Sequence, residues 1–130
     1  MLSNDRIIAR LAHVSGLVAA YLFGSHARGT AGEGSDVDVG LWLQDAPKTL
    51  DDLQLDLAAD LEQELDVPVD VVVLNSAPSD LVHRVLRDGV LLAERDRSAR
   101  IRLEVHARND YFDMLPVRSV YRYGRRGVAS

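Results

Sequence analysis

The sequence predicts a layered α/β or α+β domain, because short apolar runs alternate along it with longer amphipathic segments. The order of these segments is αβ(α)βαβαβα, and elements that alternate in this way pack as helices on a sheet. The chain has 130 residues, which suits one domain with a hydrophobic core. Its composition, 47% hydrophobic and 27% charged, is that of an ordinary globular protein.

The first elements are a helix and a buried strand. We expect the helix from Ser3 to about Ser15, capped by Ser3 or Asn4, since its apolar residues fall mostly on one face. These are Ile7, Ile8, Leu11, Ala12 and Val14. The apolar run 17–23 ends at Gly24 and predicts a short buried strand.

The middle of the chain predicts a second strand and a long helix. Residues 25–30 favour a short helix or turn, and 37–43 a strand. Thr49 begins the long helix, with Asp52 as a weak capping-box partner. The buried face of that helix is marked by Leu50, Leu53, Leu57, Leu61 and Leu65.

The second half of the chain continues the alternation. The run 67–75, rich in β-branched residues, predicts a third strand, and Pro78-Ser79 opens a helix that closes at Gly89. "GVLLAE" predicts a short fourth strand, and 97–114 a last helix that Pro116 ends. We therefore expect one domain over residues 1–115 and a basic tail over 116–130.

Composition and charge exclude several classes of protein. The chain has no cysteine, so it forms neither disulfides nor a cysteine-based zinc site. It has no apolar run of about 18 residues that would span a membrane, and no signal-peptide pattern at its start. We therefore expect a cytoplasmic protein. The formal net charge of -5 argues against a general affinity for nucleic-acid backbones.

Two aspartates interrupt the second predicted strand at its start. Asp36 and Asp38 lie on the same face, because side chains alternate along a strand. Two adjacent carboxylates repel each other unless a cation lies between them, and Mg²⁺ prefers a few carboxylates together with waters and phosphate oxygens. The alternative for an isolated pair is that one aspartate ends a loop and the other faces solvent.

The residues just before this pair favour the functional interpretation. Gly24-Ser25 follows the first strand and opens toward a helix, whose free N–H groups can bind a phosphate. Taken alone, Gly24-Ser25 favours the alternative, an ordinary helix N-cap after a strand. If the two strands are neighbours, the phosphate-binding turn and the aspartate pair meet at one place.

A third carboxylate, Asp70, lies inside the apolar run 67–75. If that strand lies beside the second one, Asp70 joins Asp36 and Asp38, and three carboxylates can hold two metals, or one metal and a base. The alternative is a charge at the start of a strand, held by a neighbouring backbone group or lysine.

The spacing of these residues resembles the signature of the DNA polymerase β-like nucleotidyltransferases. The string "GSHARGTAGEGSDVDVGL" is similar to that of the minimal nucleotidyltransferases (MNT), and the chain's small size is similar to the antitoxins of HEPN/MNT toxin–antitoxin pairs. The resemblance implies a nucleotidyltransferase-like fold, a short mixed sheet with packed helices. It also implies Mg²⁺ at Asp36, Asp38 and Asp70, with Gly24 and Ser25 on the nucleotide's phosphates and Arg28 supporting that loop.

The resemblance also implies a partner. After the nucleotidyltransferase core only a helix and a tail are expected, so another protein is expected to present the acceptor. In HEPN/MNT pairs the MNT protein moves AMP from ATP to a tyrosine of a HEPN-type ribonuclease toxin and neutralises it. Two alternatives stay open: an antitoxin that acts by binding alone, and a small-molecule adenylyltransferase whose pocket is completed by a second subunit.

Other polar residues carry weaker signals. His13, His83 and His106 are scattered, without metal-ligand spacing, and the carboxylates of helix 49–65 suit a solvated helix face. The tail 116–130 contains four arginines interleaved with two tyrosines and no acid. It could dock on an acidic partner or on RNA, or be a disordered terminus.

Overall fold

The structure is a computed structural model that describes residues 4–24, 27, 36–45 and 50–114. Its helices and strands follow in the order α1 (Asn4–Leu11), β1 (Leu17–Phe23), β2 (Val37–Leu43), α3 (Leu50–Leu65), β3 (Val69–Val73), α4 (Ser79–Asp88), β4 (Val90–Glu94) and α5 (Arg97–Met114). Within the described part of the chain, no helix combines the length and the apolar character that crossing a membrane requires.

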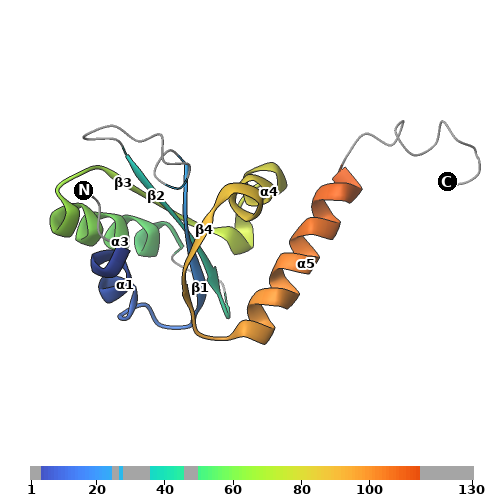
Figure 1. Ribbon diagram of the computed structural model, residues 1–130, viewed down its shortest axis with the longest axis horizontal. Coiled ribbons are helices and arrows are strands. Elements are labelled where there is room, and N and C mark those ends of the chain that lie inside the picture. The colour runs from blue at the N-terminus through green and yellow to red at the C-terminus, as the bar shows by residue number, and fades with distance from the viewer. Residues whose placement is uncertain (1–3, 25–26, 28–35, 46–49, 115–130) are drawn as a thin grey trace, which may run out of the picture.

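The four strands form one mixed sheet in the order β3-β2-β1-β4. β1 runs antiparallel to both β2 and β4, whereas β2 and β3 are parallel. Helices α1 and α3 lie on one side of this sheet, and α4 and α5 on the other (Figure 1). The predicted fold class, a short mixed sheet with packed helices, is confirmed.

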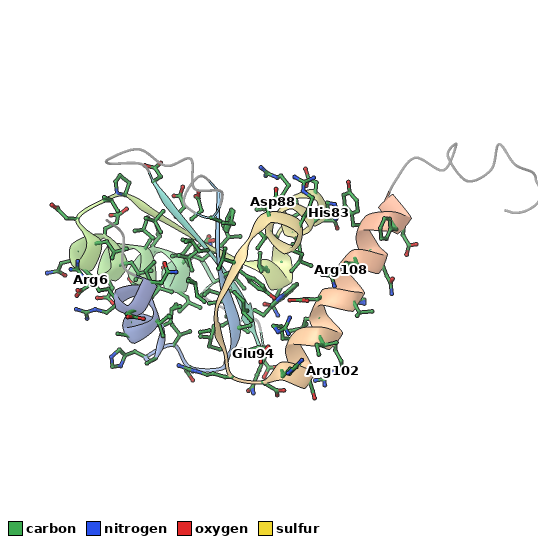
Figure 2. The ribbon with its side chains drawn as sticks, viewed as in Figure 1. Arg6, His83, Asp88, Glu94, Arg102 and Arg108 are labelled. Carbon is green, nitrogen blue, oxygen red and sulfur yellow. The ribbon has the colours of Figure 1, made fainter. Side chains whose placement is uncertain are left out.

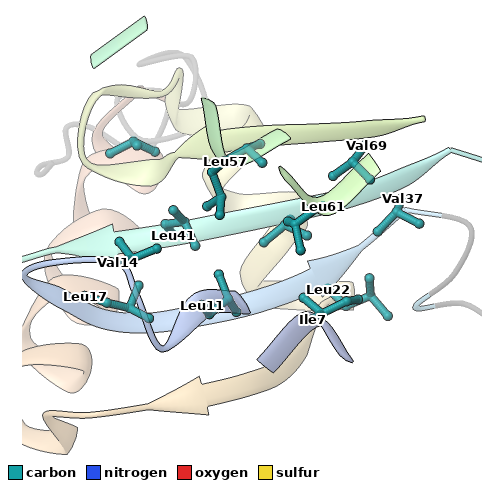
Figure 3. Packing of buried hydrophobic residues seen from close by; sticks show 14 of the residues in the cluster. Ile7, Leu11, Val14, Leu17, Leu22, Val37, Leu41, Leu57, Leu61 and Val69 are labelled. Carbon is teal, nitrogen blue, oxygen red and sulfur yellow. The ribbon is translucent and has the colours of Figure 1, made fainter. Parts of the chain in front are cut away.

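The face under α1 and α3 is an apolar core (Figure 3). Ile7 and Leu11 of α1 pack with Leu57 and Leu61 of α3 against strand residues such as Leu41. Ion pairs join the two helices at their outer edge, where Arg10 Nη2 lies 2.6 Å from Glu64 Oε1. This layer therefore combines burial in the middle with charge pairing at its rim.

The opposite face buries a second cluster under α4 and α5. Val82 and Val85 of α4 and Ala99 of α5 pack on β1 and β2, where Tyr21 and Trp42 are only 4% and 3% exposed. Unlike the first layer, this one also buries a carboxylate, that of Glu104 on α5.

Two predicted elements, the first helix and the third strand, differ from the observed ones. The first helix ends at Leu11, and Arg95 donates to the carbonyls of Leu11 and Val14, which satisfies acceptors that the early end leaves open. Ile8 belongs to the mostly one-sided apolar pattern of this helix, but it is 36% exposed, because Ile7 and Leu11 mark the inner side. The third strand stops at Val73, where a 3-10 turn, Leu74–Ser76, begins.

Candidate functional site

Gly24 directly follows the first strand and lies at the edge of the site. Phe23 of β1 pairs with Asp38 of β2, and the chain then turns at Gly24 with a φ of 76°. That backbone angle lies in the left-handed region, which favours glycine. A Cβ at this position would overlap Oδ2 of Asp38. Gly24 is therefore required both by the turn and by the approach of the Asp38 carboxylate.

The second and third strands place Asp38 beside Asp70. These residues are register partners in the parallel β2–β3 ladder, so their side chains point to the same face of the sheet. Asp38 is half-buried, Asp70 is exposed, and Asp36, just before β2, is also exposed. The expected neighbourhood of the first, second and third strands is confirmed, and it brings Gly24, Asp38 and Asp70 together.

The carboxylates fit a loosely held magnesium ion better than a closed protein cage. Among the residues that the structure describes, no three acidic, histidine or cysteine side chains stand in the arrangement of a metal site. Mg²⁺ does not need one, because it keeps several waters and takes one or two carboxylates plus substrate phosphates. Asp38 and Asp70 on one face, next to a glycine that admits no side chain, suit that kind of site.

The remaining predicted site residues lie outside the described part of the chain. These are Ser25 and Arg28, which the resemblance implied for phosphate binding, and most of the short helix or turn expected at 25–30. Within that segment only Ala27 is described, as helical and packed against the first core cluster. The roles of Ser25 and Arg28 stay predictions.

Comparison with known proteins agrees with this arrangement. The family model for the polymerase beta nucleotidyltransferases matches residues 5–98, which include Gly24, Asp36, Asp38 and Asp70. The chain belongs to this nucleotidyltransferase family.

Three of the proteins that this nucleotidyltransferase matches are named as a protein adenylyltransferase or as part of a toxin–antitoxin pair. Protein adenylyltransferase MntA of Shewanella oneidensis is 37% identical over 90 residues, which are 68% of this chain and 63% of that relative. A solved toxin–antitoxin structure with AMP-PNP contains a chain with a TM-score of 0.80 and 28% identity, covering 91% of this chain and 94% of that one. A structure of a tri-AMPylated Shewanella oneidensis HEPN toxin with its MNT antitoxin matches with a TM-score of 0.72 and 26% identity, covering 89% of each chain.

A pocket lies beside Asp70, between α3 and the open edge of β3. It has a volume of about 580 Å³, and its lining includes Asp70, Val71, Gln54, Ala58 and Glu62. Side chains of α3 hydrogen-bond to the backbone at both ends of this strand edge. Glu62 accepts from the Val69 N–H at 2.9 Å, and Gln54 accepts from the Val73 N–H at 2.9 Å. The small side chain of Ala58 keeps the middle of this edge open.

This pocket was not found by the sequence analysis. The carboxylates of the long helix were expected to form a solvated face, and Glu62 is exposed as expected, but two of them also make contacts that the pattern did not predict. Glu62 accepts a strand N–H, and Glu64 pairs with Arg6 and Arg10 of α1. The sequence feature that could have indicated the pocket is the spacing of Gln54, Ala58 and Glu62, which lie four residues apart on one side of a helix.

Behind the site, a buried polar network ties α5 to the sheet of the nucleotidyltransferase. Tyr21 Oη donates to the Glu104 carboxylate and accepts from Trp42 Nε1 at 3.2 Å. Arg100 donates to Glu104 at 2.8 Å and also pairs with Glu94. Burial, and then the hydrogen bond to Glu104, raise the pKa of Tyr21, so the phenol stays protonated as a donor.

The scattered histidines occupy ordinary structural positions in the described part of the chain. His83 of α4 stacks on Tyr111 of α5, with ring centroids 3.8 Å apart. His106 Nε2 lies 3.3 Å from Asp110 Oδ2, one turn along α5. His13 is exposed after α1.

Proposed function

We propose that this nucleotidyltransferase is an antitoxin that transfers AMP from ATP to a tyrosine of a HEPN-type toxin and so neutralises it. The observation that carries the proposal is the meeting of Gly24, Asp38 and Asp70 at one edge of the sheet. The match to protein adenylyltransferase MntA and to the structure holding a tri-AMPylated toxin supports this acceptor. The protein would work in the cytoplasm, where ATP is available.

Each predicted site residue has a separate role in the proposed reaction. The turn at Gly24, together with Ser25, would bind the phosphates of ATP, because a backbone without a side chain lets N–H groups approach them. Asp36 and Asp38 would hold Mg²⁺, with Asp70 beside them. When bound, the ion neutralises charge on the phosphate oxygens. Arg28 would support the phosphate-binding loop.

The transfer itself exchanges one bond for another. The tyrosine oxygen of the toxin forms a bond to the α-phosphorus of ATP, and the bond from that phosphorus to the bridging oxygen breaks, which releases pyrophosphate. The phenolic proton must leave as the bond forms. Asp70 is exposed and shares a face of the sheet with its register partner Asp38, so we assign it the acceptance of that proton. Positioning and electrostatics then supply most of the rate.

The direct experiment weighs the toxin. We would incubate the purified chain with ATP, MgCl₂ and the HEPN-type protein encoded beside it, and measure the intact mass of the toxin by mass spectrometry. The expected result is a gain of about one or more AMP units, lost in the double variant Asp36→Asn/Asp38→Asn.

Two other results would overturn the proposal. Full neutralisation by the double variant without a mass change would make the protein an antitoxin that acts by binding alone. The absence of any HEPN-type reading frame beside its gene, with AMP transferred to a small molecule, would make it a small-molecule adenylyltransferase.

A further inference from the structure

The last helix, α5, carries apolar side chains on two opposite faces. Ala99, Leu103 and Ala107 pack into the cluster under α4 and α5. Ile101, Val105 and Phe112 are instead 43%, 49% and 58% exposed. Since Val105 follows Ile101 by four residues and Phe112 follows Val105 by seven, these three lie along one side of the helix. We call them the outer stripe.

A second apolar stripe on a surface helix indicates a contact beyond the domain. A helix that packs on one side only has a polar outer face, and apolar side chains grouped on a surface mark interaction sites more often than single ones do. The outer stripe is grouped in this way, whereas Leu55 of α3, 68% exposed, has no second exposed large apolar residue on its helix in the described structure.

The outer stripe is flanked by positive charge. Arg97, Arg102 and Arg108 each lie three or four residues from a member of the stripe, and all three are exposed; Figure 2 labels Arg102 and Arg108 on α5. The single carboxylate at the same spacings, Glu104, is buried; it accepts from Tyr21 and lies 3.7 Å from Arg108 Nη1, so Arg97 and Arg102 carry the positive charge that Glu104 does not neutralise. The surface is therefore apolar and basic on a chain whose net charge is -5.

The buried network holds this surface in a fixed orientation. Glu104 bonds to Tyr21 of β1, and Arg100 joins Glu104 to Glu94 of β4. An interaction surface on a helix that is already ordered loses little conformational entropy on binding.

The comparisons connect α5 with toxin–antitoxin proteins. The family model ends at residue 98, just after α5 begins. The toxin–antitoxin chain seen with AMP-PNP nevertheless matches 91% of this chain. So large a share has to include part of α5, because the unmatched remainder is shorter than this helix. The helix is therefore an addition to the common nucleotidyltransferase unit that the toxin–antitoxin protein shares.

From these observations we infer that the outer stripe of α5 is the docking surface for the toxin. We therefore expect the toxin's matching surface to be apolar in its centre and to carry carboxylates at its rim, opposite Arg97 and Arg102. This inference rests on the proposed function for the identity of the partner.

The experiment measures toxin binding without ATP, by calorimetry, and AMP transfer in parallel. Val105→Glu places a charge in the centre of the stripe and should weaken toxin binding about tenfold or more. Phe112→Ala, which adds no charge, should weaken it in the same direction. Ile8→Glu makes the matched change on α1, at a residue that is 36% exposed, and should leave the affinity within about twofold. Arg102→Glu should slow association and reduce its dependence on salt.

The outcomes separate this inference from the proposed function. If the wild type adds AMP, and Val105→Glu and Phe112→Ala bind and modify the toxin as well as it does, the docking surface lies elsewhere and the inference is overturned. If the wild type adds no AMP but the stripe variants still lose toxin binding, the inference holds and the enzymatic proposal fails. If the chain alone sediments as a dimer that Val105→Glu converts to a monomer, a second copy covers the stripe, which also overturns the inference.

Discussion

The side chains buried under α1 and α3 in the described structure are apolar, and polar contacts there lie at the rim, whereas the face under α4 and α5 buries Glu104 beside Tyr21 and Trp42. Asp38 and Asp70 lie on this second, more polar face, at the end where β1 stops at Gly24. The face under α1 and α3 stabilises the sheet mainly by burial. The face under α4 and α5 carries buried and adjacent charges, which are unfavourable for folding, and it holds the aspartates to which we assign the proposed reaction.

The largest expected effect on stability comes from the apolar face. Leu61→Ala removes a side chain that is 0% exposed, and we expect it to lower the free energy of unfolding by about 2–5 kcal/mol. AMP transfer per folded molecule should stay close to that of the wild type. Urea denaturation followed by circular dichroism, with Leu55→Ala at an exposed position of the same helix as the control, checks this. A loss of transfer without a loss of stability would show that the faces are not separate in function.

A smaller effect on stability, with a large effect on activity, is expected at the turn into the site. Gly24 and Gly16 both have positive φ angles, but only at Gly24 does an added Cβ meet the Asp38 carboxylate. Alanine at either position should cost about 1–2 kcal/mol for the left-handed backbone. Gly24→Ala alone should also reduce AMP transfer, by about a hundredfold if Asp38 moves by about 1 Å. Equal transfer by the two variants would show that Asp38 is not held against this turn for catalysis.

An intermediate effect on stability is expected when the hydroxyl group of Tyr21 is removed from the face under α4 and α5. Tyr21→Phe leaves the Glu104 carboxylate and the Trp42 N–H without their shared partner. We expect a loss of about 1–3 kcal/mol in the free energy of unfolding. The orientation of α5 should loosen as well, which amide hydrogen exchange along residues 97–114 would detect. If the exchange and the stability are both unchanged, the network does not fix α5.

The smallest effect is expected at the rim of the apolar face. Hydrogen bonds from Arg10, and then from Arg6, lower the pKa of Glu64 in the folded protein. A lowered folded-state pKa gives stabilisation that is present above the unfolded pKa of about 4.3 and lost as the pH falls through the folded value. Glu64→Gln should therefore flatten the fall in melting temperature between about pH 5 and pH 3. Asp56→Asn, on an exposed part of α3, should leave that fall as steep as in the wild type.

Much of this architecture follows from the sequence. The bounds of β1, β2 and α5 were predicted because glycine, proline or a polar residue interrupts each pattern where the element ends. The neighbourhood of Gly24, Asp38 and Asp70 was predicted on the condition that their strands are neighbours, and the strand order β3-β2-β1-β4 meets that condition.

The rest depends on contacts that no local pattern encodes. Glu104 and Tyr21 are 83 residues apart, so a charge in the helix pattern of α5 gave no sign of its partner. Glu62 looked like a solvated helix residue, because only the position of β3 reveals the N–H that it accepts. Ile8 fits an apolar helix pattern, but the side of α1 that faces the core is determined by its packing against α3, and Ile8 lies off that side.

The central claim is that the polar face is built for nucleotide transfer at the expense of stability. It is tested most directly by Asp38→Asn, with Asp45→Asn, an exposed residue beyond the other end of β2, as the matched control. We would measure the rate of AMP addition to the toxin and the melting temperature of each variant. The account predicts that Asp38→Asn transfers AMP about a thousandfold more slowly, as a loss of about 4 kcal/mol of transition-state stabilisation requires. Its melting temperature should equal or exceed that of the wild type, because repulsion among the neighbouring aspartates is relieved. A normal transfer rate, or a slow rate accompanied by a matching fall in melting temperature, would contradict the account.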